Sequence, residues 1–187
     1  MARGEHQKLK LLFLQQLLLE QSDEEHPIST QAIIHALEAR GIASERKSIY
    51  RDMEVLSEFG LDVHGRKGRS AGWFVGERRF QLPELKLLVD AVQSCKFITK
   101  RKSRELIRKL ESLSSVHQAR QLHRQVYVTG RPKTVNETVY YSIDQLHAAI
   151  SGGRAVTFQY FEYDLNKKPV FRHGGARYTV SPYGLIW

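Results

Sequence analysis

The stretch that decides the fold is SERKSIYRDMEVLSEF, residues 44–59. Wound at 3.6 residues per turn, it becomes a helix with one apolar face. That face holds Ile49, Met53, Leu56 and Phe59. We expect it to pack against the rest of its domain, with Ser44 capping the start of the helix and Gly60 closing its end.

The opposite side of this helix carries hydrogen-bond donors on its first two turns. These are Lys47, Ser48, Tyr50 and Arg51, with Ser48 at the border of the apolar face. Donors in the leading turns of a helix suit the part of a recognition helix that enters the major groove. Glu54 and Glu58 follow on the same side, where a phosphate would repel them, so only the first half of the helix is expected to approach DNA. The alternative is a solvated helix face of mixed charge.

The flanking sequence predicts two earlier helices and a later hairpin. The first helix is expected over 7–20, and the second is expected to be capped by Ser29 or Thr30 and to stop at Gly41. Short strands at 61–63 and 73–75 enclose a glycine-rich segment. Three helices followed by a hairpin is the order of a winged helix.

The predicted hairpin is basic at its tip. Arg66, Lys67 and Arg69 sit among glycines, as a wing that reaches the DNA backbone or minor groove would require. Alone, such a tip is also typical of a flexible, solvated turn. Together, the helix and the tip favour contact with nucleic acid.

Composition indicates a globular protein with an excess of positive charge. The chain has 187 residues and a formal net charge of +9, and its one cysteine, Cys95, excludes an internal disulfide. Basic and acidic residues number 12 and 12 over 1–79, 12 and 4 over 80–135, and 5 and 4 over 136–187. The charge therefore favours polyanionic partners without marking the N-terminal part as the binder. The apolar run 9–19 is too short to cross a bilayer, so we expect no membrane partner and a cytoplasmic, nucleoid-associated protein.

Residues 80–135 predict a helical segment, with Pro83 suited to the first turn of a helix. The basic run over 96–109 is an additional candidate for phosphate contacts. We favour the other interpretation, in which this run is the solvated face of a helix.

Residues 136–187 predict a helix followed by strands. The helix is expected to end at Gly152-Gly153. Aromatic and β-branched residues then predict strands over 156–163, 178–180 and 183–187.

Three stretches resemble the WYL-domain transcriptional regulators of bacteria. They are residues 44–61 with the basic hairpin behind them, AAISGGRAVTFQY over 148–160, and YTVSPYGL over 178–185. The resemblance implies an α+β chain, with an N-terminal winged helix-turn-helix, a helical linker and the start of a small, Sm-like β-barrel. The boundaries would be 1–79 for the DNA-binding domain, 80–135 for the linker and 136–187 for the N-terminal part of an effector-sensing WYL domain. The Trp-Tyr-Leu strand that names the family would come after Trp187, so we expect this second domain to be incomplete.

The resemblance further implies a homodimer that binds double-stranded DNA and senses a nucleic-acid or anionic small-molecule effector. The DNA-binding residues would be Arg46, Lys47, Ser48, Tyr50, Arg51, Arg66, Lys67 and Arg69. The effector-binding residues would be Arg154, Tyr160 and Arg177. The alternatives are that Arg154 covers a helix end and that Tyr160 fills the core, and for Tyr160 we favour the core.

Catalysis is not indicated by the sequence. The eight histidines show no metal-ligand spacing, and there is no phosphate loop or nucleophile elbow, so we expect no catalytic residue, metal or cofactor. Two rival hypotheses remain. In one, the winged helix is a protein-interaction module with no direct DNA contact; in the other, a further C-terminal part carries an enzyme that this half regulates.

Overall fold

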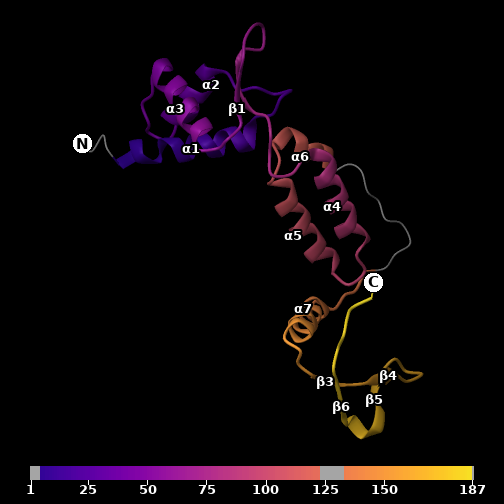
Figure 1. The fold of residues 1–187 in the computed structure, drawn as a ribbon. Coiled ribbons are helices and arrows are strands. Elements are labelled where there is room, and N and C mark those ends of the chain that lie inside the picture. The colour runs from indigo at the N-terminus through magenta and orange to yellow at the C-terminus, as the bar shows by residue number, and fades with distance from the viewer. Residues whose placement is uncertain (1–4, 123–132, 187) are drawn as a thin grey trace. The chain divides into compact units, whose positions relative to one another are not determined.

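The computed structural model describes residues 5–122 and 133–186, and it mixes helices with short antiparallel strands (Figure 1). This agrees with the α+β class. The chain divides into two compact units, one of Met1–Cys95 with Arg101–Arg131 and the other of Lys96–Lys100 with Pro132–Trp187. The predicted boundaries at 79 and 135 stay predictions.

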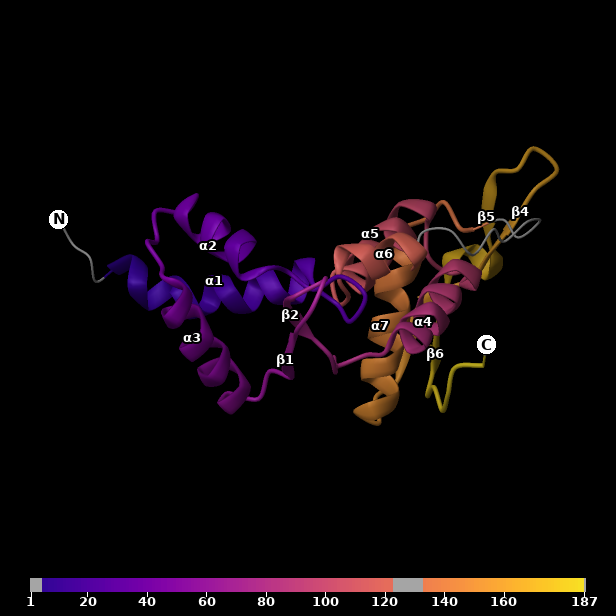
Figure 2. The ribbon, with the colours of Figure 1, turned by 90° about the horizontal axis from the view of Figure 1, so that it is seen from above.

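The first unit begins with three helices and a hairpin, in the predicted order. These elements are α1 (Glu5–Gln21), α2 (Thr30–Glu38), α3 (Arg46–Glu58), β1 (Val63–Arg66) and β2 (Gly72–Val75). Both α2 and α3 pack across α1 (Figures 1 and 2). The core comprises Leu14, Leu18, Ile33, Leu37, Ile42, Ile49, Met53, Leu56 and Val75. Burial of these apolar side chains is the main stabilising contribution to this part of the fold.

The ends of the helices follow the predicted capping only in part. Ser29 caps α2 as predicted, because its hydroxyl accepts a hydrogen bond from the amide of Ala32 at 3.1 Å. The prediction for Ser44 is wrong: Glu45 occupies the N-cap of α3, and its side chain makes no capping bond.

The prediction that Phe59 packs in the core is also wrong, since 76% of its side chain is exposed. The helix ends at Glu58, and the chain reverses at Gly60, which has φ +103°. The amide of Leu61 then donates to the carbonyl of Leu56 at 3.0 Å. Leu61 packs against the core in place of Phe59.

The hairpin is held against the turn before α2. Gly65 pairs with Trp73 and Arg66 with Gly72, so Arg66 lies in strand β1. The predictions that the strand covers 61–63 and that Arg66 lies in the loop are therefore wrong, because the pairing begins at Val63 and continues to Arg66. Ile28 and Trp73 exchange two backbone hydrogen bonds of 2.9 and 2.8 Å. These bonds fix the base of the hairpin beside the N-terminus of α2.

Three further helices complete the first unit. They are α4 (Leu82–Ser94), α5 (Lys100–Glu111) and α6 (Val116–Leu122). Pro83 lies in the first turn of α4, as predicted, and α6 contacts both α4 and α1. The basic residues Arg104, Arg108 and Lys109 lie on the exposed side of α5, while Ile107 is buried. Part of the predicted linker, 123–132, lies outside the described residues.

Among its described residues, the second unit contains one α-helix, one short 3-10 helix and two strand pairs. Its elements are α7 (Thr138–Ser151), β3 (Val156–Gln159), β4 (Phe161–Tyr163), β5 (Pro169–Phe171), η1 (Arg172–Gly175) and β6 (Arg177–Val180). The helix ends at Gly152-Gly153, as predicted, and β3 pairs with β6 while β4 pairs with β5. The strand predicted over 156–163 is broken at Tyr160. The prediction of a strand over 183–187 is wrong for 183–186, which form no strand, and Trp187 lies outside the described residues.

Candidate nucleic-acid interface

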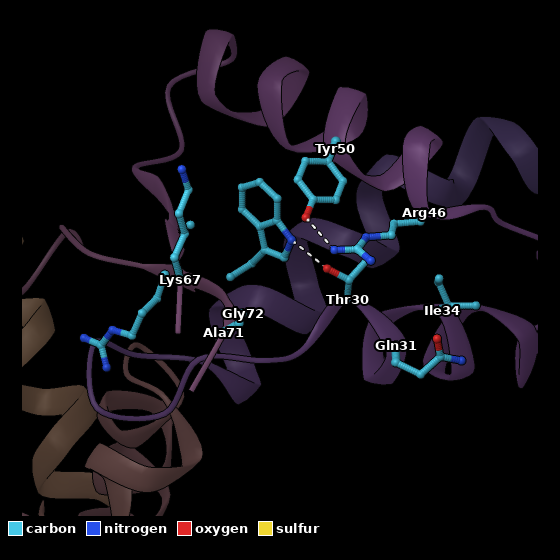
Figure 3. A pocket seen from close by; sticks show the side chains of 11 residues that line it. Thr30, Gln31, Ile34, Arg46, Tyr50, Lys67, Ala71 and Gly72 are labelled. Atoms are coloured by element: carbon cyan, nitrogen blue, oxygen red, sulfur yellow. Dashed lines mark hydrogen bonds between the residues drawn. The ribbon is translucent and has the colours of Figure 1, made fainter. Parts of the chain in front are cut away.

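A groove with a volume of about 360 Å³ lies between the N-terminal ends of α2 and α3 and the hairpin (Figure 3). It is lined by Thr30, Gln31, Ile34, Arg46, Tyr50, Gly65, Arg66, Lys67, Ala71, Gly72 and Trp73. The charged members of this set are Arg46, Arg66 and Lys67, and all three are cations. The charge of the groove therefore suits an anionic ligand.

Tyr50 and Trp73 form the aromatic wall of the groove. The edge of one ring meets the face of the other, with centroids 5.1 Å apart and planes at 80°. The indole Nε1 of Trp73 donates to the hydroxyl of Thr30 at 3.2 Å (Figure 3). The position of Tyr50 is thus tied through Trp73 to the start of α2.

Arg46 lies one turn before Tyr50 on α3 and contacts the same side chain. Its guanidinium donates to the hydroxyl of Tyr50 at 3.4 Å and lies 5.8 Å from the centroid of the tyrosine ring (Figure 3). The hydrogen bond from Arg46 and its positive charge lower the pKa of Tyr50. Both side chains are exposed, so the pair presents a cation and a hydroxyl to the groove.

Arg66 and Lys67 form the hairpin side of the groove. Arg66, at the end of β1, packs its guanidinium 5.3 Å from the ring centroid of Phe74. This contact holds the end of a long side chain near the hairpin. Lys67 is exposed at the start of the loop. The structure thus brings together four of the predicted DNA-binding residues: Arg46, Tyr50, Arg66 and Lys67.

The other four predicted residues lie outside the groove lining. Lys47 and Arg51 are exposed on α3, and Arg69 is exposed in the hairpin loop. Ser48 is half-buried, and its hydroxyl accepts a hydrogen bond from Lys10 of α1 at 2.7 Å. Ser48 therefore points toward α1 instead of joining Lys47 and Arg51 on the outer face.

Sequence reasoning did not single out Gln31, Trp73 or Lys10 as functional residues. The sequence predicts only a strand at Trp73, although the position of an aromatic residue just after the basic, glycine-rich loop is a signal that could identify it. Gln31 gave no signal, because an exposed amide in the first turn of a helix is ordinary. Lys10 gives no signal either, because in the sequence it only interrupts an apolar run.

The three predicted effector-binding residues lie in the second unit. The side chain of Arg154 lies beside Gly152 at the end of α7, which favours the interpretation that it covers a helix end. Tyr160 is 49% exposed, so the prediction that it fills the core is wrong. The guanidinium of Arg172 lies 5.1 Å from the ring centroid of Tyr160, and Arg177 is exposed at the start of β6.

The described residues contain neither a membrane-spanning helix nor a cluster of metal ligands. Over residues 5–122 and 133–186, no helix is both long and apolar enough to cross a membrane. In the same ranges, no group of three or more His, Cys, Asp or Glu side chains has the arrangement of a metal site.

Comparison with known proteins returns no matching family model, no matching curated protein and no matching solved structure. The membership of the WYL-domain regulators implied by residues 44–61, 148–160 and 178–185 stays a prediction.

Proposed function

We propose that this chain is a sequence-specific DNA-binding transcription regulator whose N-terminal part is a winged helix-turn-helix. The observation that carries the proposal is the groove between α3 and the hairpin, whose lining includes three cations, Arg46, Arg66 and Lys67, together with Tyr50. In this proposal α3 is the recognition helix and the β1–β2 hairpin is the wing. A DNA strand would pass between them.

The groove and the outer face of α3 would contribute differently to binding. Cations in the groove would neutralise phosphates, which position the duplex but carry no sequence information. Lys47 and Arg51, exposed on the first two turns of α3, would reach base edges in the major groove. Glu54 and Glu58 are exposed further along, so contact with the negatively charged duplex is favourable only near the start of the helix.

The second unit would sense an effector and the chain would act as a homodimer. Both statements rest on the resemblance to WYL-domain regulators, including the proposal that residues 136–187 are the start of a small Sm-like barrel. The guanidinium of Arg172 beside the ring of Tyr160 is already paired with the carboxylate of Glu162, so the proposal of an anionic effector rests on the resemblance and not on this contact. In a dimer, the effector would change the spacing or orientation of two half-sites.

The test is a binding measurement on paired double variants. Duplexes recovered from a random library by the native chain serve as the probe. Lys47→Ala with Arg51→Ala should weaken binding by at least about tenfold, since two contacts to bases or phosphates are lost.

The matched control is Arg104→Ala with Arg108→Ala, which removes the same charge from the exposed side of α5. We expect the control to bind within about twofold of the native chain, because long-range charge effects are screened at physiological salt. Equal binding by both double variants and the native chain would favour a protein-interaction module. If both double variants weaken DNA binding equally, binding depends on the net charge of the chain and not on contacts made by α3.

A further inference from the structure

Lys10 is a buried lysine on the face of α1 that also carries Leu14 and Leu18. It lies on α1 one turn before Leu14 and is 4% exposed. Lysine is almost never this buried unless its ammonium is paired, because removal of the charge from water is costly. The partners of Lys10 therefore identify what the buried charge does.

Both partners of Lys10 lie on α3. Its Nζ donates to the hydroxyl of Ser48 at 2.7 Å and contacts Oδ2 of Asp52 at 2.6 Å. The side chains of Lys10 and Asp52 are 5% and 18% exposed, so the ion pair is largely shielded from water. Ser48 and Asp52 are four residues apart and lie one above the other on the helix. The ammonium group of Lys10 thus contacts two consecutive turns of α3.

The contacts of Lys10 add a directional restraint on α3 to that of the apolar core. Ile49 and Met53 bury α3 against its neighbours and fix which face of the helix turns inward, but apolar contacts are less directional than hydrogen bonds and define the exact angle less sharply. Buried polar pairs have strict geometry, and their best-attested role is to specify one arrangement among similar ones. The contacts of Lys10 with Ser48 and Asp52 select one rotation of α3.

The selected rotation decides where the outer face of α3 points. Lys47 and Arg51 each directly precede a residue that Lys10 holds, so they lie about 100° around the helix from it. With Ser48 and Asp52 turned toward α1, Lys47 and Arg51 are exposed. The same rotation places Tyr50 against Trp73.

We propose that Lys10 is a positioning residue for sequence discrimination: it holds Ser48 and Asp52 and thereby sets the angle at which Lys47 and Arg51 meet the bases. The inference rests on the proposed function. Lys10 itself contacts no DNA. Phosphate contacts tolerate a small rotation of α3, whereas hydrogen bonds to base edges do not.

The test uses the double variant Lys10→Met with Asp52→Asn. It removes both members of the ion pair and leaves the net charge unchanged, so non-specific binding and its salt dependence should stay within about twofold of the native values. Replacement of a buried ion pair by neutral groups is often nearly neutral for stability, so the variant should fold. Binding is measured to a duplex that the native chain selects from a random library and to a scrambled duplex of the same composition.

We expect the ratio of the two affinities to fall by about tenfold, which corresponds to one lost base contact. Ile33→Val is the control, because it loosens the same core from α2 without touching the ion pair. The control should keep the native ratio. A native ratio in the double variant would overturn the role of Lys10 while leaving the proposed function intact.

A second readout needs no DNA. Rotation of α3 moves Tyr50 relative to Trp73, so the near-ultraviolet circular dichroism of the double variant should differ from that of the native chain and of Ile33→Val. A native spectrum in the double variant would overturn the positioning role directly. A third outcome separates the two proposals. If the native chain binds all duplexes equally but the spectrum of the double variant still differs from the native one, the proposed function fails. The role of Lys10 in orienting α3 is then retained.

Discussion

The hydroxyl of Ser115 donates a hydrogen bond to Oδ2 of Asp23, and this bond ties the start of α6 to the turn between α1 and α2. Both residues are buried, with Asp23 4% and Ser115 0% exposed. The other oxygen of Asp23 accepts from the amides of Glu25 and His26, at 3.1 and 2.9 Å, and from Nδ1 of His26 at 2.7 Å. The ring of His26 in turn stacks on His117 of α6, with centroids 3.8 Å apart. The helical segment after the hairpin is therefore joined to the proposed DNA-binding part by a polar cluster.

Loss of the Ser115 hydroxyl should destabilise the first unit. Ser115→Ala leaves one oxygen of a buried carboxylate without its donor, and we expect the free energy of unfolding to fall by about 1–3 kcal/mol in urea titrations. Ser112→Ala is the matched control, because the hydroxyl of Ser112 is exposed and donates only to a nearby backbone carbonyl. It should change the free energy by less than about 0.5 kcal/mol. Equal effects of the two substitutions would show that the Asp23–Ser115 bond contributes nothing specific.

Acid should weaken the same cluster through Asp23. Burial alone would raise the pKa of Asp23, but hydrogen bonds from Ser115 and His26, together with the charge of His26, lower it below its ordinary value of 3.8. A carboxyl with a lower pKa in the folded state contributes stability above its unfolded pKa and loses it as pH falls through the folded pKa. The free energy of unfolding of the native chain should therefore drop between pH 3.8 and the lower folded pKa, while Asp23→Asn lacks this part of the slope. Parallel pH profiles for the two proteins would contradict the assignment.

Gly72 should tolerate no side chain. A Cβ at this position would lie 2.6 Å from the carbonyl oxygen of Ile28, a backbone atom held by the bonds that anchor β2. Gly72→Ala should lower the free energy of unfolding by about 1–3 kcal/mol, since the hairpin must shift. The control is Gly184→Ala, because its added Cβ would have no atom within 4 Å. Thermal unfolding of both variants is measured, and the control should unfold like the native chain. Native stability in Gly72→Ala would mean that the hairpin is not anchored at Ile28.

The hydroxyl of Tyr50 should contribute to DNA affinity separately from its ring. Tyr50→Phe keeps the contact with Trp73 but removes the acceptor for Arg46. We expect affinity for a selected duplex to fall by about threefold to tenfold, the effect of one hydrogen bond, without a change in stability. Tyr141→Phe removes an exposed hydroxyl from α7 in the second unit and should bind like the native chain. Native affinity in Tyr50→Phe would exclude a role for the Arg46–Tyr50 pair.

The order of elements in the first unit could be predicted because its signals are local. Helical spacing, Ser29 as a cap and Pro83 in a first turn all act over a few residues. The end of α3 at Gly60 is as predicted, but Phe59 is exposed, because helical spacing assigns a residue to a face without showing whether the last turn of that face is covered. The spacing of Ile49 and Met53 fits helical packing equally well with or without Phe59.

The groove could be predicted only in part. The cations of α3 and the hairpin are visible as local clusters, and the structure does bring Arg46, Arg66 and Lys67 together. The contact between Tyr50 and Trp73 depends on tertiary packing across more than twenty residues, so no local pattern reveals it. The same holds for Lys10, whose partners lie on a different helix.

The salt dependence of binding tests the central claim most directly. The affinity of the native chain for a selected duplex is measured from low to physiological salt, and the same titration is repeated for Arg66→Ala with Lys67→Ala. If the hairpin side of the groove holds phosphates, the logarithm of the native affinity falls linearly with the logarithm of the salt concentration, and the double variant reduces that slope by about two. An identical slope in the two proteins would contradict the account, because the groove would then neutralise no phosphate.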